Sequence, residues 1–174
     1  MKYFKKTSTT KFVCTLVSIF YLGAQGAPAV ASDVGSVRIP MQVLVKSLRR
    51  DFGAMRGSYL MPGALVSEQI LESMGVPDQT FGLSDGNYLV SGCRVHSCDE
   101  KSAIIANSDG KPMASALIHF HCHVAKHGVV NCDVSPRLTL FLKPSSDQII
   151  LSQELEAWAK SKAAIGSVET RMLR

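Results

Sequence analysis

Residues 88–107 read YLVSGCRVHSCDEKSAIIAN, and this stretch decides the fold. The apolar and β-branched residues at its two ends predict two strands, Tyr88–Cys93 and Ser102–Asn107. Between them, Cys93 and Cys98 bracket Arg94–Ser97, with a histidine at position 96. The stretch therefore predicts two strands joined by a loop that two cysteines delimit.

The spacing of the two cysteines limits what this loop can be. A redox pair usually has only two residues between its cysteines and lies at a helix N-terminus, whereas four residues separate Cys93 from Cys98. A zinc site would need further ligands at suitable spacing. Two interpretations remain: a disulfide that only stabilises the fold, or one that presents Arg94–Ser97 on a hairpin-like protrusion. Gly92 and the flanking strands favour a protrusion, whereas the spacing alone favours a disulfide that only stabilises the fold.

The N-terminus is typical of a secretory signal peptide. Residues 1–11 hold four lysines and no acidic residue, an apolar run follows at Phe12–Ala24, and Ala29–Ala31 forms a small-x-small triplet. The apolar run is shorter than the roughly 20 residues that span a bilayer, and Cys14 lacks the context of a lipoprotein cleavage site. We expect cleavage after Ala31, export, and a single mature domain over residues 32–174 with no membrane attachment.

Most of the net positive charge of the chain lies in this N-terminal segment. The whole sequence carries a net charge of +5, but residues 32–174 hold 15 basic and 14 acidic side chains. This near balance gives no indication of nucleic-acid binding. Four cysteines remain after cleavage, an even number that favours two disulfides in an oxidising compartment. Three pairings are possible, and Cys93–Cys98 with Cys122–Cys132 is the expected one because each closes a short local loop.

Apolar periodicity predicts helices before the first strand and after the last. Residues 41–55 and 65–75 carry apolar side chains at spacings of three and four, and the second segment ends at Gly75. Near the C-terminus, we expect Ser152 to cap a helix that buries Leu155 and Trp158 and stops at Gly166.

Further strands follow the cysteine loop. Asp109-Gly110 is a hairpin signal, after which Met113–Val124 reads as one long strand, and residues 137–142 (RLTLFL) as another. These elements predict an α+β domain: an antiparallel meander with helices at both ends.

The segment Tyr88–Asn107 resembles the signature region of the inhibitor of vertebrate lysozyme family, known as Ivy. Members of that family are periplasmic proteins with a loop of the form C-K-P-H-D-C between two strands. The resemblance implies an Ivy-like fold and a proteinaceous inhibitor whose loop enters the active-site cleft of a lysozyme. His96 would be the group that reaches the carboxylates of that glycosidase. Cys93 and Cys98 would hold the loop, and Gly92 would allow the loop to leave the strand sharply.

Three loop residues differ from the family pattern. Arg94 replaces lysine and keeps the charge with a different shape. Val95 replaces proline, which removes one source of rigidity, and Ser97 replaces an aspartate that could orient the histidine. The same fold could therefore bind another partner.

A second feature is the sequence HFHCHVAKH, residues 119–127. On a continuous strand, His119, His121 and His123 would share one face, and such a cluster with His127 nearby could bind zinc or copper. Histidines two apart on a strand are about 7 Å from each other, so their rings do not converge easily. A periplasmic metal-binding protein is thus the alternative function.

The sequence gives little support for an enzyme. It contains no G-x-S-x-G, H-E-x-x-H or glycine-rich phosphate motif, and the even cysteine count argues against a catalytic thiol. We therefore expect a non-enzymatic protein without a cofactor, and the resemblance to the Ivy family implies a periplasmic binding protein whose partner is a lysozyme-type glycosidase. A homodimer is compatible with the sequence.

Overall fold

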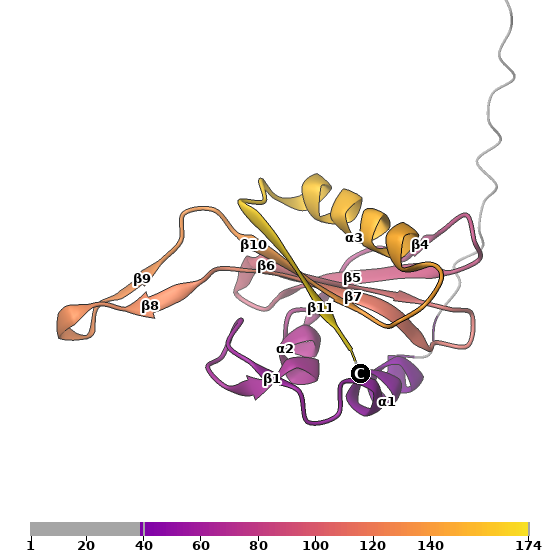
Figure 1. Cartoon of the computed structure of the whole chain (residues 1–174), viewed down its shortest axis with the longest axis horizontal. Coiled ribbons are helices and arrows are strands. Elements are labelled where there is room, and N and C mark those ends of the chain that lie inside the picture. The colour runs from indigo at the N-terminus through magenta and orange to yellow at the C-terminus, as the bar shows by residue number, and fades with distance from the viewer. Residues whose placement is uncertain (1–38, 40, 174) are drawn as a thin grey trace, which may run out of the picture. The chain divides into compact units, whose positions relative to one another are not determined.

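The computed structural model describes Ile39 and residues 41–173. The expected signal peptide, residues 1–31, and Cys14 lie outside these described residues. The described part forms an α+β domain in which a mostly antiparallel sheet lies between helices (Figure 1). The helices are α1 (Met41–Phe52), α2 (Val66–Glu72) and α3 (Gln148–Lys162), with one 3₁₀ turn, η1 (Lys126–Gly128).

The main sheet has seven strands in the order β11-β10-β7-β6-β5-β3, and β4 also pairs with β5. All its pairs are antiparallel except β10 with β11, which run parallel. Its strands are β3 (Val76–Pro77), β4 (Phe81–Gly82), β5 (Tyr88–Arg94), β6 (Ser97–Ala106), β7 (Pro112–His119), β10 (Arg137–Leu142) and β11 (Ser167–Met172). Two small ribbons stand apart from it: β1 (Arg56–Gly57) with β2 (Ala64–Leu65), and β8 (Cys122–Val124) with β9 (Val130–Cys132).

Helices cover both faces of the sheet, so its central strands are buried on both sides. α3 packs on one face through Leu151, Leu155 and Trp158, and α1 and α2 pack on the other (Figure 1). Successive residues of β7 therefore alternate between two cores: Ile118 faces α3, whereas Leu117 faces α1 and α2.

The N-terminal helices form where the apolar spacing predicts them, but each is shorter. α1 ends at Phe52, followed by Gly53 with a φ of 51°, a conformation that favours glycine. α2 ends at Glu72, before the predicted terminator Gly75. Their buried residues include Leu44 and Leu48, which have no exposed surface.

Gln69 fixes the chain between α1 and α2. Its Oε1 accepts hydrogen bonds from the backbone N–H groups of Tyr59, Leu60 and Met61, and its Nε2 donates to the carbonyls of Gly57 and Ala64. The side chain is fully buried. One amide thus satisfies five backbone groups of the loop, which would otherwise lack partners.

The C-terminal part differs from the sequence prediction in two ways. α3 begins at Gln148 rather than after Ser152, and it ends at Lys162 rather than at Gly166. The chain then forms β11, a strand that the sequence did not predict. β10, α3 and β11 make a strand–helix–strand crossover, a connection that places the two strands parallel. The sheet is therefore not a simple meander, and α3 is not the last element.

Candidate functional site

The cysteine loop is a tight hairpin between β5 and β6. Arg94 pairs with Ser97, so the turn consists of Val95 and His96 alone, and a disulfide joins Cys93 to Cys98. Both turn residues are exposed, and His96 adopts a φ of 64°. Few non-glycine residues take this conformation, and histidine is enriched among those that do. The side chain of His96 makes no hydrogen bond to any other described residue, so it is presented at the tip.

A short strand holds the base of this hairpin from the side. β3 pairs with β5, placing Val76 opposite Cys93 and Pro77 opposite Gly92. A Cβ on residue 92 would lie 2.7 Å from the carbonyl oxygen of Val76 and 3.0 Å from the Cα of Met74. Gly92 is therefore required for the close approach of this neighbouring segment, rather than for a sharp exit of the loop from the strand.

Arg94 points back from the tip and braces the two arms of the hairpin. Its Nη1 donates a hydrogen bond to Glu100 on β6 at 2.7 Å, and its Nε lies 3.7 Å from a carboxylate oxygen of Glu72 on α2. The hydrogen bond to Glu100 raises the pKa of Arg94 above its ordinary value. The guanidinium is thus paired within the protein, whereas the turn residues Val95 and His96 are exposed.

A second hairpin closed by a disulfide leaves the same end of the sheet. The register places Cys93 of β5 beside Lys101 of β6, and Lys101 beside Ile118 near the end of β7. After β7, the chain continues into the β8–β9 ribbon, which extends away from the sheet (Figure 1). Cys122 and Cys132 form the disulfide at its base. Both disulfides match the expected pairing, and they indicate an oxidising compartment.

The ribbon exposes apolar side chains. Val124 and Val130 are paired across its two strands and are 72% and 61% exposed, on the same face as the disulfide. His123 is paired with Asn131, so it lies on the opposite face. Val124 and Val130 thus form an exposed apolar pair on one face of the ribbon, opposite the face that carries His123.

The histidine cluster does not form the predicted arrangement. β7 ends at His119, and Phe120 and His121 separate it from β8, so residues 113–124 are not one strand. β7 ends there because its pairing with β10 begins at His119 and Arg137, and the chain beyond has no partner in the sheet. His119 is only 5% exposed, and its Nε2 lies 3.0 Å from Oγ1 of Thr139. Burial lowers its pKa below the ordinary value.

His121, His123 and His127 are exposed, unlike His119. Across the described residues, no three histidine, cysteine, aspartate or glutamate side chains come together as metal ligands. The geometry thus separates the candidate ligands His119, His121 and His123 instead of gathering them.

The sequence did not reveal the partners that support the site. Glu72 and Glu100 hold Arg94, and β3 supports Cys93, but these contacts join segments that only the fold brings together. A signal did exist for Glu100, since opposite charges on the two arms of a tight hairpin fall close together. Nothing in the sequence indicated that the valines of the ribbon are exposed, because a strand buried within the sheet would have the same composition.

The chain matches no family model, no curated protein and no solved structure. Among the described residues, none of the helices has both the length and the hydropathy that crossing a bilayer requires.

Proposed function

We propose that this protein is an exported, Ivy-like inhibitor that binds a lysozyme-type glycosidase in the periplasm and blocks its active-site cleft. The observation that carries the proposal is the tip of the β5–β6 hairpin. A two-residue turn, closed by the Cys93–Cys98 disulfide, presents His96 with an exposed side chain and no intramolecular hydrogen bond among the described residues.

The chemistry of the tip suits a cleft that contains carboxylates. Lysozyme-type glycosidases act through a pair of carboxyl groups that flank the scissile bond. An imidazole can donate a hydrogen bond to one of them, and a protonated imidazole forms a stronger, charge-assisted bond. Because Arg94 is held by Glu100 and Glu72, His96 is the group available for this contact.

The rigidity of the hairpin favours binding. The disulfide, the pairing with β3 and the Arg94–Glu100 ion pair fix the conformation before any partner is present. A loop that is already ordered loses little conformational entropy on association, so more of the contact energy appears as affinity. Val95 in place of the family's proline does not leave the turn unsupported, since these contacts constrain its neighbours on both sides.

The β8–β9 ribbon would act as a second contact. It leaves the same end of the sheet as the hairpin and carries the exposed Val124 and Val130. With the His96 tip in the cleft of the enzyme, the ribbon would contact the surface of the enzyme outside the cleft. Apolar contacts there would add area to an interface that a single two-residue turn cannot supply.

Lysis of bacterial cell walls by purified lysozymes, with added mature protein of residues 32–174, tests this proposal. We expect stoichiometric inhibition of at least one lysozyme class, c-type or g-type. Replacing His96 by alanine should weaken it by roughly thirtyfold or more, whereas His123→Ala, a change at an exposed histidine on the polar face of the ribbon, should not. No inhibition of either class by the folded, disulfide-bonded protein would reject the proposal.

A further inference from the structure

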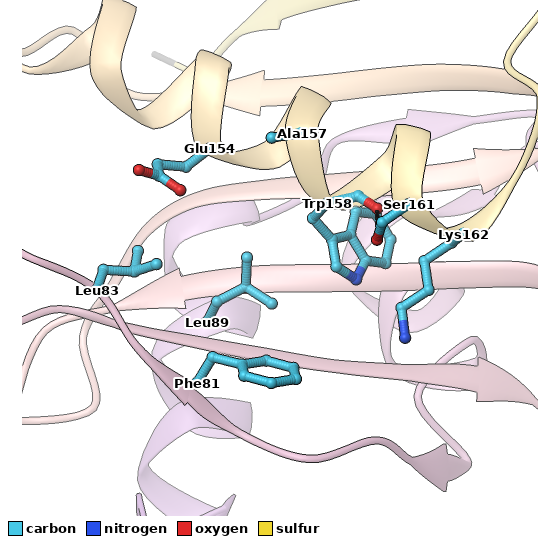
Figure 2. Close-up of a pocket in the computed structure, with 8 residues that line it drawn as sticks. All are labelled: Phe81, Leu83, Leu89, Glu154, Ala157, Trp158, Ser161 and Lys162. Carbon is cyan, nitrogen blue, oxygen red and sulfur yellow. Dashed lines mark hydrogen bonds between the residues drawn. The ribbon is translucent and has the colours of Figure 1, made fainter. Parts of the chain in front are cut away.

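A cavity of about 250 Å³ lies between α3 and the β4–β5 strands, on the α3 face of the sheet (Figure 2). Leu83, Leu89 and the ring of Trp158 give it an apolar lining, and Phe81 borders it from β4. Leu89 belongs to the half of β5 that is remote from the Cys93–Cys98 hairpin. This cavity is therefore a separate feature from the site proposed above.

Trp158 carries an unpaired hydrogen-bond donor at this cavity. Its side chain is 6% exposed, and its Nε1 is buried without a hydrogen-bond partner among the described residues. Figure 2 shows the indole at the Lys162 end of the cavity, with its nitrogen turned to the side where Phe81 lies. A buried N–H group without an acceptor is rare in proteins, because it loses its bond to water and gains none. The indole thus lacks an acceptor at this position.

Charged groups mark the two ends of the cavity. The ammonium group of Lys162 lies near the indole, whereas the carboxylate of Glu154 lies at the other end, two helical turns earlier on α3 (Figure 2). The Nζ of Lys162 is also 3.1 Å from Oδ2 of Asp78, which leaves it further hydrogen-bond donors. Glu154 therefore repels an anionic group from its end of the cavity, whereas Lys162, whose charge is offset by Asp78, offers hydrogen-bond donors to such a group at the other end.

We propose that this cavity binds a small amphiphile with a carboxylate head and an apolar chain. The carboxylate accepts hydrogen bonds from Nε1 of Trp158 and from Lys162, and the chain lies over Leu83 and Leu89, with Phe81 against it. Access of the carboxylate to Nε1 requires a small displacement of the side chains that cover this atom. Phe81, at the border of the cavity, is 46% exposed.

The volume of the cavity limits the length of the chain. An apolar cavity of about 150 Å³ holds benzene, which has six non-hydrogen atoms. By that proportion, a cavity of about 250 Å³ holds an occupant of roughly ten non-hydrogen atoms. Octanoate has this size and combines one carboxylate with an unbranched alkyl chain, so it is a suitable probe.

Trp158 provides a direct readout, because it is the single tryptophan of the chain. Sodium octanoate, kept below the concentration at which it forms micelles, is titrated into the disulfide-bonded mature protein while the tryptophan emission is recorded. We expect a saturable change in emission. Octylammonium, which has the same chain and the opposite charge, should bind at least tenfold more weakly. A linear, unsaturated response, or equal affinity for the two probes, would overturn the proposal.

Variants then locate the carboxylate. Lys162→Gln should weaken octanoate binding at least tenfold, whereas Lys160→Gln, on the exposed side of the same helix, should leave it unchanged. Trp158→Phe keeps an aromatic ring and removes the N–H group, so calorimetry on the folded variant, below a melting temperature that the smaller core side chain lowers, should show weaker octanoate binding. Unchanged octanoate affinity in Lys162→Gln and in Trp158→Phe would exclude the assigned site.

Discussion

The guanidinium of Arg94 donates a hydrogen bond to the carboxylate of Glu100 across the two arms of the β5–β6 hairpin, at 2.7 Å. This contact turns the cation of the loop inward. The exposed residues of the turn are Val95 and His96, and in the proposed complex Arg94 would act only through the shape of the hairpin.

Arg94→Gln should accordingly have small effects. Partly exposed ion pairs contribute about 0–1 kcal/mol, so we expect the free energy of unfolding in urea to fall by no more than about 1 kcal/mol. The affinity for lysozyme should fall by no more than about fivefold. Glu100→Gln should show the same pattern. A loss of affinity above roughly thirtyfold in Arg94→Gln alone would indicate that the cation itself contacts the enzyme.

Gly92→Ala should destabilise the protein, because the new Cβ would lie 2.7 Å from the carbonyl oxygen of Val76. Overpacking of this kind costs about 1–3 kcal/mol. Chemical denaturation of the oxidised protein measures the change. Gly86→Asn is a matched control, since asparagine tolerates the positive φ there and nothing lies within 4 Å. Equal stability of Gly92→Ala and the unmodified protein would contradict the close packing of β3 on β5.

Gln69→Leu should be among the most damaging single changes. It removes five hydrogen bonds to backbone groups of residues 57–64 at a buried position. Each buried group left without a partner costs about 1–3 kcal/mol, although solvent would reach some of them, so we expect a loss of at least about 3 kcal/mol. Gln153→Leu, at an exposed position of α3, should be nearly neutral in the same measurement.

The stability should also depend on pH through His119. Burial lowers the pKa of this residue in the folded protein, so the unfolded chain binds the proton more readily. The contribution of His119 to the free energy of unfolding is therefore complete above the pKa of this residue in the unfolded chain, about 6.5. It decreases as the pH falls below that pKa, by at most about 1.4 kcal/mol per pH unit. Urea unfolding between pH 7.5 and 5.5 measures this slope, and His119→Gln should reduce it. A slope that is unchanged in the variant would assign the effect to another group.

The sequence was sufficient for features that depend on neighbouring residues. The two disulfides each join nearby cysteines, and the turn at Gly110 lies where the Asp109-Gly110 signal predicts it, with a positive φ. The strands flanking Cys93 and Cys98 follow from their apolar and β-branched composition. These features need no knowledge of how distant segments pack.

The features that the sequence did not reveal depend on distant segments. The burial of His119 was not predicted, because a histidine that alternates with apolar residues was expected to face solvent or a metal. Here α1 and α2 cover that face too, and His119 lies with Tyr59 and Thr139. β11 is exposed over its whole length, and its sequence SVETRM has no continuous apolar stretch, so only its pairing with β10 defines it as a strand. Residues 122–132 form a separate ribbon because the chain beyond β7 has no neighbouring strand in the main sheet. No local sequence pattern indicates where that pairing stops.

The most direct test of the central claim is calorimetric titration of an inhibited lysozyme with two variants of the mature protein, His96→Ala and His123→Ala. We predict that His96→Ala weakens binding by roughly thirtyfold or more, as expected for a side chain at the centre of an interface. His123→Ala should retain the affinity of the unmodified protein. Equal affinities for His96→Ala and the unmodified protein, with both disulfides intact, would show that the hairpin tip is not the group that enters the cleft.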